Sequence, residues 1–360
     1  MVAAPSVEIA NRKIGPGQPC FIIAEAGVNH NGELSLAKRL IDVAVEAKAD
    51  AVKFQTFQAA HLASTTAPKA SYQLRAANGN ESQRAMLKRL ELSPRAHRQL
   101  ADCCRRRGIL FLSTPFDQTS ADLLEGLAVP AFKIASGELT NLPLLSYVAR
   151  KGTPLLVSTG MATLEEVREA VETIRALNHA GLVLLHCVSA YPAPAADMNL
   201  RAMQTLRETF RVPVGLSDHT LGIEVALAAV ALGACVIEKH ITLSRTLEGP
   251  DQRASLEPHE WIALVKGIRI VEAALGDGRK QPAPSERNVA EVARRSLVAN
   301  RLIPAGTRLT EACIAIKRPG TGLAPALRSQ LVGTLAKRDI AEGTLLTWEM
   351  LLDRRRTTGR

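Results

Sequence analysis

The chain has 360 residues, of which 46% are apolar and only 3% aromatic, so it can bury one large aliphatic core and a smaller one. Its net charge of +10 is spread along predicted helices and the C-terminal tail, which is typical of a solvated surface and argues against nucleic-acid binding. It shows no membrane span, no signal-peptide core and no paired spacing among its six cysteines, so we expect a cytoplasmic protein with no membrane partner.

Eight short apolar runs alternate with helical patterns. Each run opens apolar and closes on polar residues, which is typical of strands buried on both faces. The helix ends are also visible: Ser93 and Pro94 fit an N-cap and first position, and Gly108 fits a stop. This pattern predicts an α/β fold, a (β/α)8 TIM barrel. An open doubly wound sheet is the alternative, but no G-x-G-x-x-G follows the first strand. The runs are FIIAEAG (21–27), AVKFQTF (51–57), ILFLSTPF (109–116), AFKIASGE (131–138), LLVSTG (155–160), LVLLHCVS (182–189), VPVGLSDH (212–219) and ACVIEKHI (234–241).

A different pattern begins after Leu275. A stretch rich in Gly, Pro and charge is typical of a linker. Beyond it, the pattern I-x-x-G-T-x-L-T occurs twice, starting at Ile303 and at Ile340. Two copies predict a compact β-rich module with internal pseudo-symmetry, which is small enough that we expect it to dock on another surface. The expected division is a barrel domain at 1–275, a linker at 276–293, the β-rich module at 294–353 and a basic tail at 354–360.

Polar residues close all eight predicted strands, and in a barrel they meet at one mouth. Lys53 and Lys133 lie there among hydroxyl residues, a combination that suits an anion with phosphate and carboxylate groups. Salt bridging at the rim and a Schiff-base lysine of an aldolase are the alternative interpretations. The strand-end residues are Glu25, Lys53, Gln55, Ser113, Thr114, Lys133, Ser136, Glu138, Ser158, Thr159, His186, Ser189, Ser217, Asp218, His219, Glu238, Lys239 and His240.

Two of these residues, His219 and His240, close the last two strands. Neighbouring imidazoles can hold one divalent ion and leave positions open for water and substrate, whereas two histidines are too few for a closed zinc site. Each histidine could instead be a hydrogen-bonded core residue. Glu138 and Asp251 then remain as carboxylates for proton transfer or sugar hydroxyl contacts.

The motifs FIIAEAGVNHNG, AVKFQTF, FLSTPF, FKIASGE, STGM, GLSDHT, EKHITL and GPD, in this order, resemble the N-acetylneuraminate (sialic acid) synthase family. The resemblance covers residues 18–352, and the module with IKRPGTG resembles that family's SAF (antifreeze-like, β-clip) domain. It implies a transferase that condenses phosphoenolpyruvate, open-chain N-acetylmannosamine and water to N-acetylneuraminate and phosphate with C–O cleavage. Departures at Ser189, Ser244 and Gln252 leave open the related legionaminic acid synthase, which uses 2,4-diacetamido-2,4,6-trideoxymannose.

The resemblance also implies roles for single residues and a homodimer with swapped domains, in which Arg318 of one subunit reaches the sugar of the other. A non-catalytic carbohydrate- or nucleic-acid-binding protein is the remaining alternative. The implied phosphoenolpyruvate ligands are Lys53, Thr114, Lys133, Ser136, Ser158, Ser189 and Ser217, and the sugar ligands are Gln55, Asn78, Tyr191 and Arg318. The implied catalytic residues are Glu25, Glu138 and Asp251, and the ligands of a divalent ion (Mn²⁺, with Mg²⁺ or Co²⁺ as alternatives) are His219 and His240.

Overall fold

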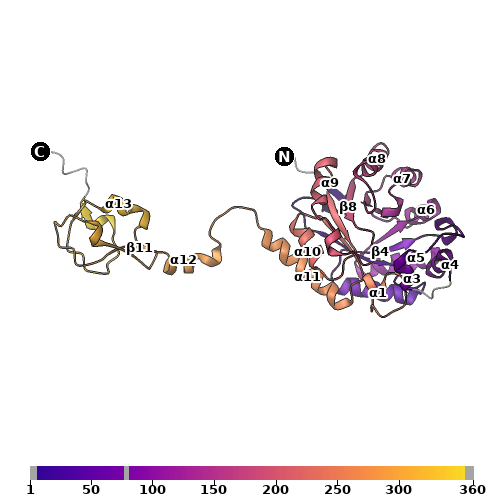
Figure 1. The fold of residues 1–360 in the computed structure, drawn as a ribbon, viewed down its shortest axis with the longest axis horizontal. Helices are drawn as coiled ribbons and strands as arrows, with labels where there is room; N and C mark the ends of the chain where they lie inside the picture. Colours follow the sequence, from indigo (N-terminus) through magenta and orange to yellow (C-terminus); the bar gives the residue numbers. More distant parts are fainter. Residues whose placement is uncertain (1–5, 77–80, 353–360) are drawn as a thin grey trace. The chain divides into compact units, whose positions relative to one another are not determined.

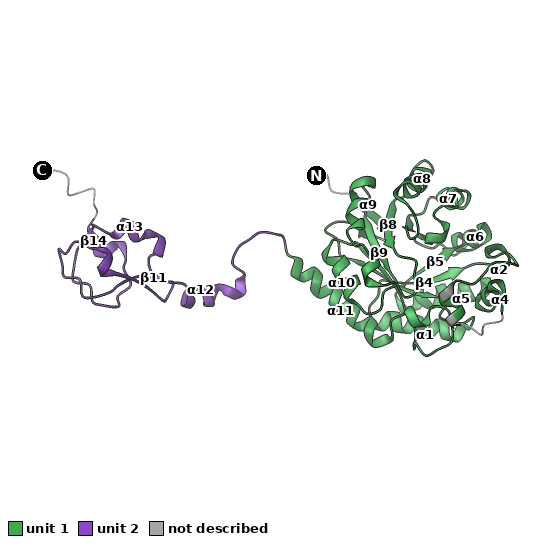
Figure 2. Cartoon of the chain, viewed as in Figure 1, with its two compact units in different colours: residues 1–276 green, residues 277–360 purple. Residues whose placement is uncertain are grey.

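The computed structural model describes residues 6–76 and 81–352 of the chain, which divides into two units (Figure 2). The first unit comprises residues 1–276 and the second residues 277–360. Asn78 and the basic tail lie outside the described residues, so what the sequence predicts for them stays a prediction. No helix in the described part of the chain is long and apolar enough to cross a membrane.

The first unit is built on an eight-stranded parallel sheet, and every predicted apolar run forms one of its strands (Figure 1). The strands are β3 (Phe21–Gly27), β4 (Ala51–Thr56), β5 (Leu110–Pro115), β6 (Phe132–Ile134), β7 (Leu155–Ser158), β8 (Leu182–Cys187), β9 (Val214–Asp218) and β10 (Val236–His240). Their order is β5-β4-β3-β10-β9-β8-β7-β6, and the two outer strands, β5 and β6, lie next to each other, which closes the barrel. The predicted (β/α)8 fold is therefore confirmed, and the open doubly wound sheet is wrong.

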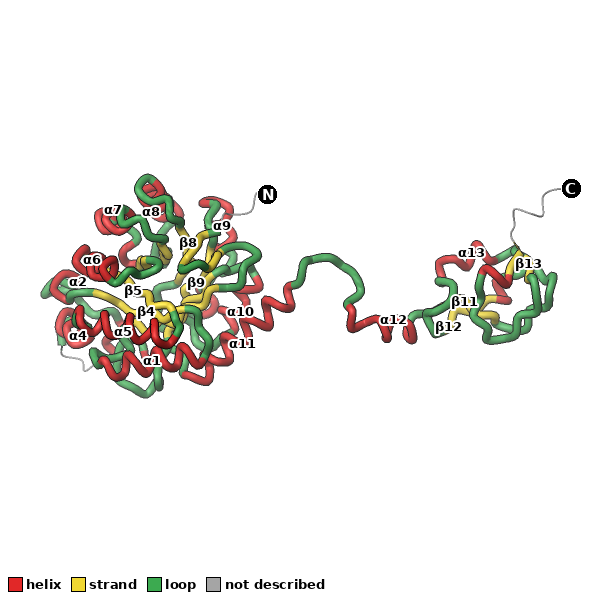
Figure 3. The backbone as a smooth tube through the Cα atoms, turned by 180° about the vertical axis from the view of Figure 1, so that it is seen from behind, coloured by secondary structure: helices red, strands yellow, loops and turns green. Residues whose placement is uncertain are grey.

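Helices surround the strands (Figure 3). The main ones are α1 (Leu34–Glu46), α5 (Pro94–Arg107), α6 (Gln118–Gly126), α7 (Leu142–Ala149), α8 (Leu164–Arg175), α9 (Ala202–Phe210), α10 (Glu224–Ala231) and α11 (Pro258–Leu275). Three short helices are inserted between β4 and α5, namely α2 (Ala59–Leu62), α3 (Ser71–Ala76) and α4 (Gln83–Leu90). The predicted ends of α5 are confirmed: the Ser93 hydroxyl accepts a 3.2 Å hydrogen bond from the Ala96 amide, and Gly108 ends the helix with a left-handed φ of 71°.

An N-terminal hairpin closes the end of the barrel where the strands begin. Its strands, β1 (Val7–Ile9) and β2 (Arg12–Ile14), pair antiparallel. Ile9 and Ile14 pack into one apolar cluster with Phe21 and other residues near the strand starts. Because apolar side chains fill this end, the polar residues at the carboxyl ends of the strands are left at the opposite mouth.

The second unit is small and rich in short strands. Its strands are β11 (Ser296–Ala299), β12 (Ile314–Lys317), β13 (Leu335–Ala336) and β14 (Leu351–Leu352), and its short helices are α12 (Arg287–Ala293) and α13 (Arg328–Leu331). The two sequence repeats meet face to face, since Ile303 and Ile340 exchange two backbone hydrogen bonds of 2.9 Å each. Gly306 and Gly343 occupy equivalent left-handed turns, with φ of 75° and 81°. Part of the predicted linker is helical, because α12 lies within it.

Candidate functional site

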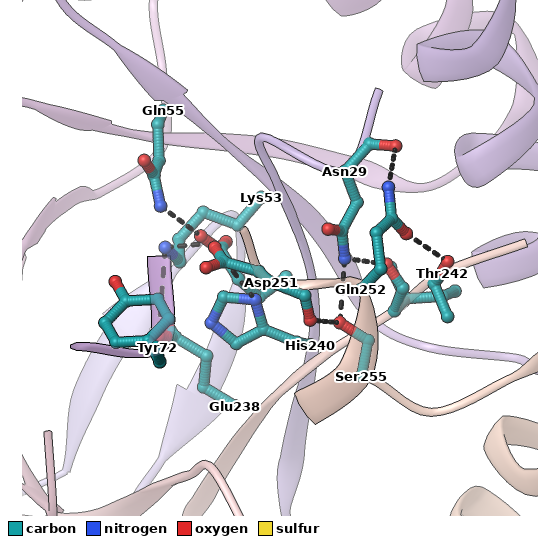
Figure 4. Close-up of polar contacts among 12 residues, drawn as sticks. Asn29, Lys53, Gln55, Tyr72, Glu238, His240, Thr242, Asp251, Gln252 and Ser255 are labelled. Atoms are coloured by element: carbon teal, nitrogen blue, oxygen red, sulfur yellow. Dashed lines mark hydrogen bonds and ion pairs between the residues drawn. The ribbon is translucent and has the colours of Figure 1, made fainter. Parts of the chain in front are cut away.

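A cavity of about 420 Å³ lies at the carboxyl ends of the barrel strands. Most of the predicted site residues line it, and Figure 4 shows several of them converging from different strands and loops. The predicted residues that line the cavity are Glu25, Lys53, Gln55, Thr114, Lys133, Ser136, Ser158, Ser189, Tyr191, Ser217, His219, His240 and Asp251. Glu138 is half-buried and does not line it; its carboxylate accepts a 2.7 Å hydrogen bond from Asn141. Arg318 belongs to the second unit.

The period of a β-strand explains which strand-end residues reach the cavity. Side chains two apart point to the same face, so Glu238 and His240 face inward together, while Lys239 between them points away. Ser113 likewise hydrogen-bonds Thr56 at 2.7 Å, outside the cavity lining. About a third of the strand-end residues therefore lie outside the cavity lining.

A buried cluster of two lysines and two glutamates forms the charged side of the cavity. Lys53 Nζ lies 2.7 Å from Glu25 Oε2 and 3.7 Å from Glu238 Oε1, and it donates a 3.0 Å hydrogen bond to Thr114. Lys133 Nζ lies 3.4 Å from Glu238 Oε1. Glu238 is thus shared between the two lysines, a role that the sequence analysis left unassigned although its spacing from His240 places it in the cavity.

Burial sets the protonation behaviour of this cluster. It raises the pKa of Glu25 to about 7, against the opposing effect of Lys53. It also opposes the charged form of Lys53, but Glu238 and Glu25 outweigh it and raise the pKa of this lysine. For Lys133, burial prevails and lowers the pKa. The two lysines, Lys133 first, overcome burial at Glu238 and lower the pKa of its carboxyl. The positive and negative charges of the cluster nearly balance, so we expect a bound anion to shift the protonation of its carboxyl groups.

Hydroxyl groups form the next part of the lining, and a glycine behind them, Gly160, holds one of them in place. The Gly160 amide, just after β7, donates a 3.0 Å hydrogen bond to Ser136 Oγ. A Cβ atom at Gly160 would lie 2.8 Å from that same oxygen and would also collide with the Ser189 hydroxyl. The Ser158 hydroxyl is buried and has no hydrogen-bond partner among the described residues. Because buried polar groups normally have partners, this orphaned hydroxyl favours a bound polar ligand.

The two predicted metal-ligating histidines lie side by side, with ring centroids 5.3 Å apart. His219 Nδ1 donates a 2.8 Å hydrogen bond to the Val188 carbonyl, which orients the ring as in many metal-binding histidines. His240 Nδ1 is buried without a hydrogen-bond partner in the described part of the chain and lies 3.7 Å from Asp251 Oδ2. Burial, followed by His219, lowers the pKa of His240 well below its usual value, which keeps its imidazole neutral as a metal requires.

The donor set at this point fits an open metal site. No group of three or more His, Cys, Asp or Glu side chains converges in metal-binding geometry within residues 6–76 and 81–352. The protein therefore offers two imidazoles and leaves the other coordination positions to water or substrate. This arrangement is consistent with the divalent ion that the resemblance implies.

A second network supports the loop that carries Asp251 (Figure 4). Gln252 is fully buried; its amide nitrogen donates a 3.0 Å hydrogen bond to the Asn29 carbonyl, and its oxygen accepts one from Thr242. Ser255 Oγ donates a 2.7 Å hydrogen bond to the Asp251 carbonyl. Gln252 does not line the cavity, so this departure from the family pattern affects the loop and leaves the cavity lining unchanged.

Several lining residues were not expected from the sequence, among them Tyr72, Cys187 and Met161. Tyr72, from α3, stacks on Tyr191 with ring centroids 4.9 Å apart, and Tyr191 lies 4.2 Å from the His219 ring. Cys187 ends β8 with its sulfur 3.8 Å from His219 Nδ1. Met161 follows Gly160 at the rim. Cys187 could have been found, because it lies two residues before Ser189 in the same predicted strand run, whereas no signal in the sequence brings Tyr72 to the barrel mouth.

Comparisons with known proteins show the family to which the chain belongs. The NeuB family model matches residues 40–280, and the SAF domain model matches residues 294–352. The chain is 48% identical to the N,N'-diacetyllegionaminic acid synthase of Legionella pneumophila over 94% of this chain and 98% of that protein. It is 39% identical to the human N-acetylneuraminate-9-phosphate synthase over 85% of each chain.

A solved structure supports the same family. The structure of the N-acetylneuraminic acid (sialic acid) synthetase from Leptospira borgpetersenii aligns with a TM-score of 0.71 and 38% identity, covering 80% of this chain and 96% of that one. These relatives are sugar acid synthases, so the protein is an enzyme of carbohydrate biosynthesis. The chain belongs to the NeuB family and carries a C-terminal SAF domain.

Proposed function

We propose that this enzyme is a legionaminic-acid-type synthase that condenses phosphoenolpyruvate with 2,4-diacetamido-2,4,6-trideoxymannose. From the sequence alone, N-acetylmannosamine is the first expectation and this sugar is the alternative. The relatives favour the second, since the synthases of Legionella pneumophila and Campylobacter jejuni that are named for diacetyllegionaminic acid are 48% and 46% identical to this chain. The observation that carries the chemistry is the pairing of two lysines with two histidines in one cavity.

The lysine side of the cavity is suited to phosphoenolpyruvate. Lys53 and Lys133 are buried point charges, and hydroxyls from Thr114, Ser136, Ser158, Ser189 and Ser217 supply oriented donors around them. The phosphate and carboxylate groups would take over the lysine contacts that Glu25 and Glu238 now make. Glu25, whose pKa is raised to about 7, can take up a proton when the anion displaces it, which limits the excess of negative charge.

The histidine side is suited to the sugar aldehyde. His219 and His240 would hold the divalent ion, for which we propose Mn²⁺ with Mg²⁺ or Co²⁺ as alternatives, and the ion when bound supplies Lewis-acid polarisation of the aldehyde. Tyr191 covers His219 and limits access of water. Gln55 lies beside Glu25, with a 3.2 Å hydrogen bond between them, on the side proposed for the sugar.

The bond changes balance with one water molecule. Carbon 3 of phosphoenolpyruvate attacks the aldehyde carbon, whose oxygen takes a proton. Water adds to carbon 2 and loses one proton; the tetrahedral carbon then breaks its C–O bond to phosphate, which leaves with the bonding electrons, and the carbon-2 hydroxyl gives its proton to the phosphate as the keto group forms. Burial raises the pKa of Asp251 to about 6 and that of Glu25 to about 7, so both can exchange protons near neutral pH. Glu138, whose pKa burial also raises, remains a third proposal for this role.

The dimer is proposed on family grounds alone. We propose that the enzyme acts as a homodimer with swapped SAF units, in which Arg318 of one copy contacts the sugar bound by the other. The SAF match over residues 294–352 supports it.

Mass spectrometry of the product tests the proposed reaction. Phosphoenolpyruvate and Mn²⁺ are supplied with either the diacetamido sugar or N-acetylmannosamine, and we expect the nonulosonic acid of the first sugar as the major product. EDTA should stop turnover and Mn²⁺ should restore it. Trapping of a pyruvyl-lysine adduct by borohydride would instead support a Schiff-base aldolase. No product from either sugar would refute the synthase.

Gly160→Ala should weaken phosphoenolpyruvate binding roughly ten- to a hundredfold, because the new methyl group displaces the hydroxyls of Ser136 and Ser189. Gly126→Ala is the matched control, since a Cβ atom there meets nothing within 4 Å. Calorimetry with phosphoenolpyruvate measures both variants. Parental affinity in the Gly160 variant would show that these hydroxyls do not hold the anion.

Phosphoenolpyruvate binding should weaken as the pH rises through about 7, because Glu25 has its pKa near 7 and becomes negative above it. Below this pH the neutral carboxyl leaves the lysines in excess, and above it the carboxylate competes with the anion. The loss between pH 6 and pH 8 should reach up to about tenfold. Glu25→Gln should flatten this dependence in calorimetry, and titration of the ligand itself cancels in the comparison. An identical slope in both proteins would contradict the assignment.

A further inference from the structure

One side of the cavity is apolar. We call the apolar wall the six side chains that both line the cavity and pack together in one apolar cluster: Val28, Leu62, Met86, Leu87, Leu90 and Phe116. Four of them come from α2 and α4, the helices inserted between β4 and α5. The apolar wall is thus an addition to the strand ends, and the barrel strands themselves contribute none of its residues.

The apolar wall is not simply a buried core. Met86 and Leu90 are buried and form its base, but Leu62, Leu87 and Phe116 are only half-buried and border the open space of the cavity. The polar lining residues on the same helices and connections, Gln73, Gln83 and Tyr72, carry no charge. Apolar surface left open inside a binding cavity indicates contact with an apolar part of the ligand.

The charges of the cavity lie elsewhere. Among its described lining residues, every lysine, glutamate, aspartate and histidine belongs to a barrel strand, apart from His219, which directly follows β9, and Asp251. Both lining lysines are engaged with Glu25 and Glu238. A phosphate ester placed against the apolar wall would therefore be buried without a cationic partner in the described lining, and a hydroxyl would lose its hydrogen bonds to water.

We propose that the apolar wall receives the carbon-6 methyl group of a 6-deoxy hexosamine and so makes the enzyme select deoxy sugars over hydroxylated and phosphorylated ones. This inference rests on the proposed function, because it takes the aldehyde end of the sugar to lie at His219 and His240. With that end held there, the far end of the carbon chain turns away from the strand ends. The apolar wall is the part of the lining whose side chains pack together in one apolar cluster, and we place the far end of the sugar against it.

Two sugars that differ at one atom isolate this contact. N-acetylmannosamine and its 6-deoxy analogue share every group except the carbon-6 hydroxyl, so the ratio of their kcat/KM values reports the carbon-6 environment alone. A well-fitting apolar contact discriminates by roughly ten- to a hundredfold. We expect the parent enzyme to prefer the deoxy sugar by about this factor.

Leu87→Gln should reduce that preference to about threefold or less. Its amide can hydrogen-bond the carbon-6 hydroxyl, and the substitution reduces the apolar area that faces the sugar. Leu62→Ser is the second variant at the apolar wall, in case the first does not fold. Leu127→Gln is the matched control, because Leu127 is also half-buried but packs on the main barrel core and does not line the cavity. The control should keep the parental ratio.

The two possible failures can be told apart. Equal use of both sugars by the parent enzyme, or an unchanged ratio in both variants, would overturn the apolar wall while leaving the synthase intact. If neither sugar is condensed, the proposed function fails. Calorimetry with the same two sugars then tests whether the apolar wall still prefers the deoxy sugar. Tighter binding of the deoxy sugar that Leu87→Gln abolishes would support the apolar wall, and equal binding would overturn it.

Discussion

His240→Ala should abolish condensation, because it removes one of the two imidazoles that face the cavity. A bound divalent ion contributes several kcal/mol to stabilising developing charge, so the loss of turnover should be at least about a thousandfold. Binding of Mn²⁺, followed by calorimetry and by its paramagnetic resonance spectrum, should be lost in parallel. This second readout does not depend on turnover.

His186→Ala is the matched control for this prediction. His186 also lies at the end of a barrel strand, but its Nε2 donates a 2.6 Å hydrogen bond to the Met198 carbonyl and it does not line the cavity. It should keep both Mn²⁺ binding and turnover apart from a modest loss of stability. Undiminished Mn²⁺ affinity in the His240 variant would remove the metal assignment.

The second large effect is expected at a salt bridge behind the site. Lys239 Nζ lies 2.6 Å from Asp218 Oδ2 and 2.7 Å from the Thr220 carbonyl, and both ionic side chains are fully buried. The pair joins β9 to β10 one residue before each histidine. Lys239→Met should lower the free energy of unfolding by about 3–5 kcal/mol, because it leaves the Asp218 carboxylate buried without its partner.

Denaturant unfolding of three variants measures this effect. Adding Asp218→Asn to Lys239→Met should recover part of the loss, since the unpaired charge is then gone. Arg105→Met, which breaks an exposed 2.8 Å salt bridge to Asp102 on α5, should change stability little. Because the buried pair sets the spacing of the two strand ends, Mn²⁺ affinity should fall in the Lys239 variant as well. A stability loss no larger than that of Arg105→Met would contradict this role.

Much of the site can be predicted from the sequence, because the alternation of side chains along a strand depends only on neighbouring positions. Lys53 and Gln55 are two residues apart on β4, as are Ser217 and His219 at the end of β9, and all four line the cavity. A run that opens apolar and closes polar thus predicts both the strand and its contribution to the mouth.

The sequence was less informative for residues that lie beyond the end of a strand. β6 ends at Ile134, and Ser136–Glu138 form a 3₁₀ turn that directs Glu138 toward Asn141 and outside the cavity lining. The inserted helices α2 to α4 were not anticipated as part of the site. Their apolar residues have the spacing of an ordinary core face, and nothing local shows that Leu62 and Leu87 border a cavity.

The amino-acid sequence by itself determined the barrel, the capped helices, the repeated module and the inward-facing polar residues, because burial and periodicity are written into neighbouring positions. Only the tertiary structure decided that Glu238 bridges two lysines, that Lys239 and Asp218 support the histidines from behind, and that Tyr72 and the apolar wall complete the cavity. Each of these depends on segments brought together by closure of the barrel, and no short-range pattern encodes such a contact.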